Sequence, residues 1–402
     1  MNGAKKEVRV QQVLLYKGAT KIQVPSAPAG NIIGLVGLKG AFAGETVSIS
    51  HIEPFEAIKH IFEPVITKSI EAESPADLPK LVEVLRQVNK EDPGIQVEIN
   101  EETGENLISG MGELHLEVIE NRIVREKGLK VKTSPPIVVY RETVAKRSQE
   151  FEGKSPNKHN KFYMIVEPVP ENMQHAIKSG ELVEGRIKKK DRETWQKLID
   201  LGVDSKEARK YVAFFNGNVL VESTRGIVHI GEVIEMVGDG FEQVMKEGPL
   251  AREPCTKIRV ILTDCKLHED AIHRGPAQVL PAVREAIKGA MADAGVTLLE
   301  PVQELQIEGP AENTADLSAL VQNKRGQLIT MDQKDNRVVA RARMPVAELF
   351  GMASDLRSAT GGRGVSFVVD QSFERIPEML KNKVTLQIRE RKGLSKDLSG
   401  VV

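Results

Sequence analysis

Residues 64–88 read PVITKSIEAESPADLPKLVEVLRQV and set the pattern from which the fold class follows. The first seven, residues 64–70, form a short run rich in β-branched side chains, which indicates a strand. Apolar side chains then recur at a spacing of three or four residues, at Leu78, Leu81, Val82, Leu85 and Val88. This spacing predicts an amphipathic helix that buries one face.

The residues that follow complete a β-α-β-β-α-β order of elements. We expect a hairpin over 95–108 with its turn at Thr103-Gly104, a helix over 113–127 that stops at Gly128, and a strand over 129–132. Alternating apolar residues support the hairpin, and a glycine is a common helix terminator. Residues 57–144 are therefore predicted to form a ferredoxin-like sandwich.

A second stretch repeats this order without an obvious sequence repeat. Its strands are expected over 303–307, 327–331, 338–344 and 365–369, and its helices over 312–322 and 346–357. We therefore predict a second ferredoxin-like module over residues 297–375. A last charged helix is expected over 377–391, within a C-terminal segment, 376–402, that should pack back on the preceding α/β domain.

Residues 1–56 show the short strands and Gly/Pro turns of a partial β-barrel. Strands are expected over 8–16, 21–24, 32–36 and 46–49. The barrel opens with almost no lead-in, which suggests that upstream strands are missing and that an edge is left unpaired. We expect this part to be the least ordered region of the chain or to pair with a second chain. The fold class predicted for the chain is thus multidomain α+β.

Between the two modules, residues 145–296 are predicted to form a larger α/β domain. Its most informative stretch is LHEDAIHRGPAQ, residues 267–278, which leads into a predicted helix from Gln278 to Ala294. A loop ending at a helix N-terminus offers free N–H groups and the positive end of the helix dipole. Arg274 adds a fork of donors. The stretch therefore predicts a site suited to phosphate.

The polar, basic loop SPNKHNK, residues 155–161, has two interpretations. A solvated connection is the ordinary explanation of such a loop. The alternative is a tip that contacts nucleic acid, with its lysines on phosphates and with His159 and Asn160 reaching base edges. The second interpretation gains weight only if the loop lies beside His273.

His268 and His273, together with Glu269 and Asp270, could form a metal or acid–base site. A metal is disfavoured because catalytic zinc normally has three protein ligands and no third ligand is suggested nearby. His273 could act as a general base, but the sequence supplies no nucleophile or oxyanion hole to go with it. Catalysis is therefore the weaker interpretation.

Three other patterns invite a phosphate- or RNA-binding interpretation and carry little weight. EGKS at 152–155 is no phosphate-binding loop, because Ser148 stands where the first glycine is needed and Pro156 obstructs the following helix. The run 188–190 with Arg192, on a predicted helix, is typical of a solvated face. The glycine cluster 361–364 could cradle phosphate or serve equally well as a flexible connection.

The bulk composition limits the classes of function. A chain of 402 residues predicts about two to four domains. Fifty-six Lys and Arg against fifty-seven Asp and Glu give a net charge of −1, so nucleic-acid contact must come from local patches. Two cysteines, Cys255 and Cys265, argue against a disulfide framework and fit a reducing cytosol. Without a signal peptide or a long apolar run, we expect a cytoplasmic protein with no membrane contact.

Taken together, several strings resemble one known family. They are PAGNI at 28–32, AGET at 43–46, ISGMGELHLE at 108–117, the stretch 267–278, and AELFG at 347–351 with DLRS at 355–358 and GGRG at 361–364. In this order they resemble the second to fifth domains of archaeal elongation factor 2, a translocation GTPase family related to bacterial elongation factor G. GPAQ at 275–278 resembles the archaeal form, and the bacterial branch fits poorly because it lacks the modified histidine.

The resemblance implies the ribosome-binding part of a factor that promotes GTP-dependent translocation of transfer RNA and messenger RNA. The fourth domain, similar in fold to a small-subunit ribosomal protein, would enter the decoding centre. His273 matches the histidine that the family converts to diphthamide, which adds reach and a cationic nitrogen. The implied RNA-contacting tip consists of Pro156, Asn157, Lys158, His159, Asn160, Lys161, Asp270, His273, Arg274, Gly275 and Gln278.

The resemblance also implies the partners. They are ribosomal RNA, transfer RNA and messenger RNA, diphthamide-synthesis enzymes, and ADP-ribosylating toxins acting through diphthamide. GTP and Mg belong to the family's N-terminal GTPase domain, which this chain does not contain. We therefore expect no catalytic residue, cofactor or metal here. The alternative is a metabolic enzyme whose paired ferredoxin-like modules bind a small regulatory molecule, although no cofactor fingerprint supports it.

Overall fold

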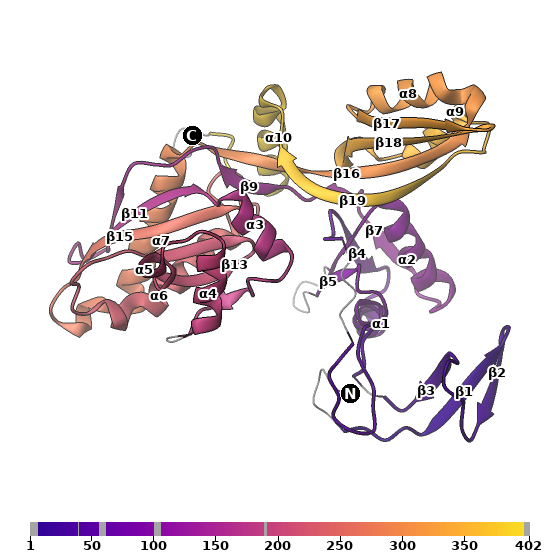
Figure 1. Cartoon of the computed structure of the whole chain (residues 1–402), viewed down its shortest axis with the longest axis horizontal. Helices are drawn as coiled ribbons and strands as arrows, with labels where there is room; N and C mark the ends of the chain where they lie inside the picture. Colours follow the sequence, from indigo (N-terminus) through magenta and orange to yellow (C-terminus); the bar gives the residue numbers. More distant parts are fainter. Residues whose placement is uncertain (1–6, 39, 56–61, 100–105, 189–190, 398–402) are drawn as a thin grey trace. The chain divides into compact units, whose positions relative to one another are not determined.

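The computed structural model describes residues 7–38, 40–55, 62–99, 106–188 and 191–397 (Figure 1). The chain divides into two compact units. The first consists mainly of Met1–Val138, and the second of Val139–Leu349 with most of the residues that follow. Both units are mixed α/β structures built on several largely antiparallel sheets.

The N-terminal part of the first unit contains a three-stranded antiparallel sheet in the order β2-β1-β3. Its strands are β1 Gln12–Lys17, β2 Thr20–Val24 and β3 Ile33–Val36. The strand predicted over 46–49 is wrong, since these residues lie outside any strand. The Thr46 hydroxyl instead accepts a hydrogen bond from the Phe55 N–H at 3.0 Å, and such side-chain bonds compete with strand pairing. Over 7–38 and 40–55 the strands close no barrel.

The rest of the first unit follows the predicted order of elements. Its members are β4 Ile66–Ala72, α1 Leu78–Glu91, β5 Gln96–Ile99, β6 Asn106–Gly110, α2 Glu113–Arg125, β7 Val131–Thr133 and β8 Ile137–Val138. The sheet order is β5-β6-β4-β7, with β8 also paired to β4. Helix α1 buries Leu81, Val84, Leu85 and Val88 because they share one face at helical spacing. The turn predicted at residues 103 and 104 lies outside the described residues.

The second unit contains a module with the same order of elements. Its members are β16 Val296–Pro310, α8 Thr314–Asn323, β17 Gln327–Lys334, β18 Arg337–Pro345, α9 Met352–Ala359 and β19 Val365–Arg375. The sheet order is β17-β18-β16-β19, and β9 Arg141–Val144 also pairs with β16. The single helix predicted over 346–357 is wrong. A short 3-10 turn, Val346–Glu348, and α9 are separated at Gly351, whose φ of 72° is incompatible with a right-handed helix.

The α/β part of the second unit is built on a six-stranded sheet in the order β10-β11-β15-β14-β13-β12. The strands are β10 Phe151–Lys154, β11 Lys161–Pro168, β12 Gly185–Arg186, β13 Tyr211–Phe215, β14 Asn218–Glu222 and β15 Ile258–Lys266. The helices are α3 Glu171–Lys178, α4 Arg192–Asp200, α5 Ser205–Ala208, α6 Ile230–Lys246 and α7 Pro276–Asp293. Lys188 precedes α4 in a loop, so the helix predicted to carry the charge run begins only at Arg192, and Lys189 and Lys190 lie outside the described residues.

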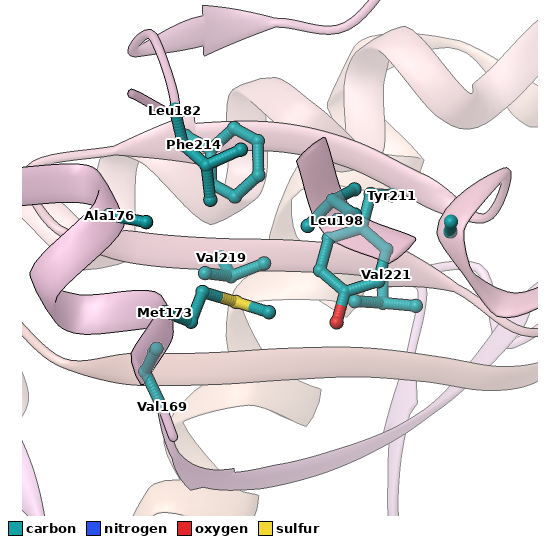
Figure 2. Close-up of a cluster of buried hydrophobic side chains, with 10 residues drawn as sticks. Val169, Met173, Ala176, Leu182, Leu198, Tyr211, Phe214, Val219 and Val221 are labelled. Atoms are coloured by element: carbon teal, nitrogen blue, oxygen red, sulfur yellow. The ribbon is translucent and has the colours of Figure 1, made fainter. Parts of the chain in front are cut away.

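Helix α7 packs on α6 and also on β10 and β11. The close approach to β10 depends on Gly153, because a Cβ at that position would lie 2.1 Å from the Ala282 carbonyl oxygen of α7. A separate buried cluster joins α3, α4 and α5 to β13 and β14 (Figure 2). Met173, Leu198, Tyr211, Phe214 and Val219 are among its members, and all are at most 5% exposed. Helices therefore pack on the sheet both at β10–β11 and at β13–β14.

Buried polar contacts join β9, which pairs with β16, to the loop that precedes β15. Glu142 of β9 is fully buried, and its carboxylate accepts hydrogen bonds from the N–H groups of Leu250 at 2.8 Å, Ala251 at 2.7 Å and Glu253 at 3.1 Å. The last helix, α10 Glu378–Arg391, contributes Arg389, whose guanidinium donates to the Leu250 carbonyl at 2.5 Å. Cys255 and Cys265 are buried and free. Within the described ranges, no helix is both long and apolar enough to cross a membrane.

Candidate functional site

Three connections of the six-stranded sheet meet where the strands β14 and β15 end. We call this end of the strands the tip edge, or simply this edge, and the opposite end the far edge. Strands β14 and β15 are parallel, so the residues that follow both strands emerge at the same edge. Strand β11 is antiparallel to β15, with Lys161 opposite Lys266, so the loop before β11 is at this edge too. Residues 155–160 of the predicted loop 155–161 and residues 267–275 of the predicted stretch 267–278 are thereby placed together. The third connection, 223–229, was not singled out from the sequence.

Three histidine side chains form the centre of this edge. The ring centroid of His273 lies 4.5 Å from that of His268, edge to face, and 5.2 Å from that of His159. The His159 and His268 centroids are 5.0 Å apart. His159 is exposed and the other two are half-buried. The loop 155–161 therefore does lie beside His273, which is the condition under which its functional interpretation gains weight.

Asn160 is the connector between the two loops. Its side chain is fully buried, and its Nδ2 donates to the His273 carbonyl oxygen at 2.7 Å. Its Oδ1 accepts from the His268 N–H at 3.0 Å. Because both amide atoms are engaged inside the protein, Asn160 positions the histidines and has little capacity left for reading a base edge.

The loop 155–160 is a tight turn held by its own side chains. The Ser155 hydroxyl donates to Asn157 Oδ1 at 2.5 Å, and the same oxygen accepts from the His159 N–H at 3.1 Å. The Asn157 N–H donates to Gln278 Oε1 at 3.0 Å, which ties the turn to the start of α7. Lys158 occupies the left-handed region at φ 61° and is exposed. The ordered turn therefore presents Lys158 and His159 to solvent.

The sequence predicts that the Arg274 guanidinium is exposed at the N-terminus of α7, and the structure places it elsewhere. The residue is only 5% exposed. Its guanidinium donates to the carbonyl oxygens of His268 at 2.6 Å and Glu269 at 2.8 Å, and to the Glu232 carboxylate at 2.6 Å. These bonds fold residues 268–274 into a closed loop, because one planar fork satisfies three acceptors at once. Arg274 therefore braces the loop from inside.

Glu232, in the first turn of α6, is a second residue that sequence reasoning missed. Its carboxylate accepts from Arg274 and lies 2.8 Å from His229 Nδ1. Hydrogen bonds from His229 and Arg274 hold the pKa of the Glu232 carboxyl below its ordinary value. No local motif marks it, since the acid and Arg274 are 42 residues apart in the chain.

The start of α7 offers fewer donors than expected for a phosphate site. Pro276 has no N–H, and the N–H groups of Gln278 and Val279 both donate to the Gly275 carbonyl, at 2.9 and 3.1 Å. Among these first-turn residues, the Ala277 N–H is the donor left over for an anion. The expectation of a built phosphate cradle at this helix is therefore wrong, since a proline and a tight first turn consume its donors.

The glycine cluster 361–364 and the string EGKS at 152–155 form hydrogen bonds within the protein. The N–H groups of Gly362 and Gly364 donate to the Arg357 carbonyl at 2.8 Å and the Thr360 hydroxyl at 2.7 Å, so the glycine cluster closes the end of α9. Glu152–Lys154 lie in β10 and pair with β11. In the part of the chain that the structure describes, no group of three or more His, Cys, Asp or Glu side chains is arranged to hold a metal ion. Ile272, 77% exposed beside His273, was also missed.

Comparison with known families matches three parts of the chain, all of them to models of elongation factor G. Family models match residues 61–135 as elongation factor G domain III, 181–295 as elongation factor G domain IV, and 297–384 as the elongation factor G C-terminus. The tip loop 267–275 thus lies in the domain IV match. The loop 155–160 lies outside that match, which begins at residue 181.

Whole-chain comparison finds archaeal relatives over nearly the full sequence. The chain is 49% identical to elongation factor 2 of Nanoarchaeum equitans over 98% of its length. The identity is 48% over 99% of the chain for the Methanosarcina barkeri protein and 49% over 97% for that of Thermococcus kodakarensis. The chain covers 54%, 54% and 53% of these relatives, and so spans about half of their length.

Proposed function

Because this chain belongs to the elongation factor 2 family, we propose that it is the ribosome-binding part of a translation elongation factor that promotes GTP-dependent translocation. Its cellular site would be the cytoplasm. The partners would be ribosomal RNA, transfer RNA and messenger RNA. GTP and Mg would act in the portion of the family's length that this chain does not span. Here the described residues serve to bind and position, and no bond-making step is assigned to them.

The proposal also covers the domain organisation. Residues 57–144 and 297–375 would be ferredoxin-like third and fifth domains, which the strand orders β5-β6-β4-β7 and β17-β18-β16-β19 support. Residues 1–56 would belong to a barrel domain, 145–296 to the fourth domain, and 376–402 to a C-terminal segment. The contact from Arg389 to the Leu250 carbonyl supports packing of that segment on the fourth domain.

The histidine cluster is the observation that carries the functional proposal. His159, His268 and His273 bring three imidazoles together at one end of the six-stranded sheet, and Lys158 is exposed on the same loop as His159. Imidazole rings can stack on unpaired bases and donate hydrogen bonds to phosphates, and a lysine adds an electrostatic contact. Such a surface fits the RNA-rich decoding centre. Asn160, Arg274 and Gln278 support it from within.

His273 is the proposed site of diphthamide. Its carbonyl is fixed by Asn160 while its ring is half-buried at the protein surface, which would hold the imidazole in one place for a modifying enzyme. The modification would extend the ring toward RNA and add a cationic group there. Diphthamide-synthesis enzymes, and toxins that act through diphthamide, would be the protein partners of this residue.

Two measurements test the proposal. Co-sedimentation with archaeal ribosomes at low salt should be weakened in a Lys158→Ala, His273→Ala variant and unchanged in Arg252→Gln, an exposed arginine in the loop before β15, at the far edge of the sheet. Absence of ribosome association in the unaltered chain, together with tight binding of a metabolite, would instead favour a small-molecule regulatory protein. Peptide mass analysis of the protein from its native host should show the added mass of diphthamide on His273, with bacterially expressed protein as the unmodified reference.

A further inference from the structure

We propose that residues 223–229, which connect β14 to α6, form a third RNA-contacting loop beside the two histidine-bearing loops. The inference rests on the proposed function and extends it to a segment that no sequence pattern singled out. Arg225 would contact phosphate, and Val228 would lie against the apolar face of a base or ribose.

The position of this loop follows from the sheet. Val219–Glu222 of β14 pair in parallel with Arg259–Leu262 of β15. The residues after Glu222 therefore leave the sheet toward the same edge as the residues after Lys266. The Ser223 N–H still donates to the Leu262 carbonyl at 2.8 Å, which anchors the base of the loop to β15. RNA bound along this edge would meet the loop.

Glu232 ties the loop to the His273 loop. Its Oε1 lies 2.8 Å from His229 Nδ1 at the end of the 223–229 segment, and its Oε2 accepts from Arg274 at 2.6 Å. Arg274 in turn holds the carbonyl oxygens of His268 and Glu269. One carboxylate thus links two loops, so that the three connections at this edge form one continuous surface.

The loop is anchored at its base and exposed at its middle. The Glu222 carboxylate accepts from the Thr224 N–H at 2.7 Å, so this acid is already engaged and does not face a ligand alone. Val228 is 87% exposed and offers an apolar surface on this loop. Arg225 is exposed and, among the described residues, makes no ion pair. The Arg225 guanidinium and the exposed Val228 side chain lie on the same loop. Together they fit a single-stranded RNA segment, which offers phosphates to the cation and base faces to the apolar side chain.

The 223–229 loop also adds positive charge at this edge. Glu269 and Asp270 are exposed beside His273, while Arg274 is neutralised by Glu232 and Lys161 is paired with Glu152 at 3.0 Å. Lys158 and Lys266 are exposed at this edge and, among the described residues, make no ion pair. Arg225 adds a third such cation on the 223–229 loop, which makes the edge suited to phosphate contact on two sides.

The salt dependence of RNA affinity tests the proposal. The probe is a synthetic RNA hairpin with a single-stranded loop, and the affinity of the full chain is measured by fluorescence anisotropy across a potassium chloride series. Arg225→Gln should lower affinity roughly three- to tenfold at low salt and reduce the log–log salt slope by about 0.7–0.9, the value of one phosphate contact. Arg252→Gln, at the far edge of the same sheet, should change neither quantity.

The outcomes separate this inference from the proposed function. If Lys158→Gln lowers the salt slope and Arg225→Gln does not, the third loop is excluded and the histidine-bearing tip stands. If neither substitution nor His273→Ala affects RNA affinity, the RNA-binding tip itself is overturned. A reduced slope in Arg225→Gln, with unchanged thermal stability, supports the third loop.

Discussion

The Nδ2 group of Asn160 donates to the main-chain carbonyl of His273 at 2.7 Å, across 113 residues of sequence. Substituting Asn160 with Ala should leave that carbonyl and the His268 N–H without partners in a buried site. We expect the free energy of unfolding to fall by about 1–3 kcal/mol in urea titrations. Asn160→Asp should do no better, since it sets an oxygen against the His273 carbonyl.

The exposed neighbour Lys158 provides the control for this prediction. Lys158→Ala removes a side chain that faces solvent at the same turn, so its unfolding free energy should stay within about 0.5 kcal/mol of the unaltered protein. Equal stability of the Asn160→Ala and Lys158→Ala variants would show that Asn160 is not the connector described above.

Arg274→Lys should loosen the His273 loop even though the charge is kept. An ammonium group is a point donor and cannot reach two carbonyls and the Glu232 carboxylate in the fork geometry of a guanidinium. Hydrogen exchange of the Ile272 and His273 amides should therefore speed up. Glu232→Gln removes only the ion pair, so it should give a smaller acceleration of hydrogen exchange. If exchange changes in neither variant, Arg274 does not stabilise the His273 loop.

Gly153→Ala should be strongly destabilising, because the backbone of β10 at Gly153 lies directly against the backbone of α7. The added Cβ would lie 2.1 Å from the Ala282 oxygen and 2.6 Å from the Ala286 nitrogen, so α7 must move away from β10. Overpacking of this kind costs roughly 1–3 kcal/mol or more. Gly231→Ala near the start of α6, where nothing lies within 4 Å, should instead be neutral or stabilising by up to about 1 kcal/mol. Thermal unfolding of the two variants measures the contrast.

Glu142 should make stability depend on pH. Burial raises the pKa of its carboxyl from the ordinary value of 4.5 to about 7, against the opposing effect of its three N–H donors. An acid whose folded-state pKa is raised binds its proton more tightly when folded, so its stabilising contribution is present below pH 4.5 and is lost as pH rises through about 7. The loss should be on the order of 3 kcal/mol.

Glu142→Gln isolates this effect, because the amide does not titrate. Unfolding free energies of both proteins should be measured from pH 4 to 8, and their difference followed with pH. The difference should change across the window from pH 4.5 to about 7. A difference that stays constant would mean that Glu142 is not the titrating group.

Local pattern was enough to predict the order of elements in the two β-α-β-β-α-β modules, the helix α7 and two of the three connections at the tip. Periodicity found α1, α2 and α7, and the polar strings 155–161 and 267–278 marked the loops that the structure brings together. It did not foresee the burial of Arg274, because a cation before a helix has the same local pattern whether it faces solvent or folds inward. The deciding partner, Glu232, lies on another helix, and only tertiary packing brings the two together.

Breaks in regular structure were harder to place. The segment 346–357 has the composition of one helix, yet Gly351 takes a positive φ and divides it. Thr46–Ile49 has strand-forming residues, but it pairs with no strand, and the Thr46 hydroxyl accepts a hydrogen bond from the Phe55 N–H. Propensity averaged over a window does not resolve a positive φ or a side-chain hydrogen bond at a single residue.

The direct join of α7 to β16 has a consequence for how the His273 loop is connected. Only Ala294 and Gly295 separate the end of an 18-residue helix from the start of a 15-residue strand. The helix spans about 27 Å and the strand about 50 Å. The first residues of that strand pair with β9 and the later ones with β18. The His273 loop is therefore connected to the second ferredoxin-like module through one helix and one strand, with only a two-residue turn between them.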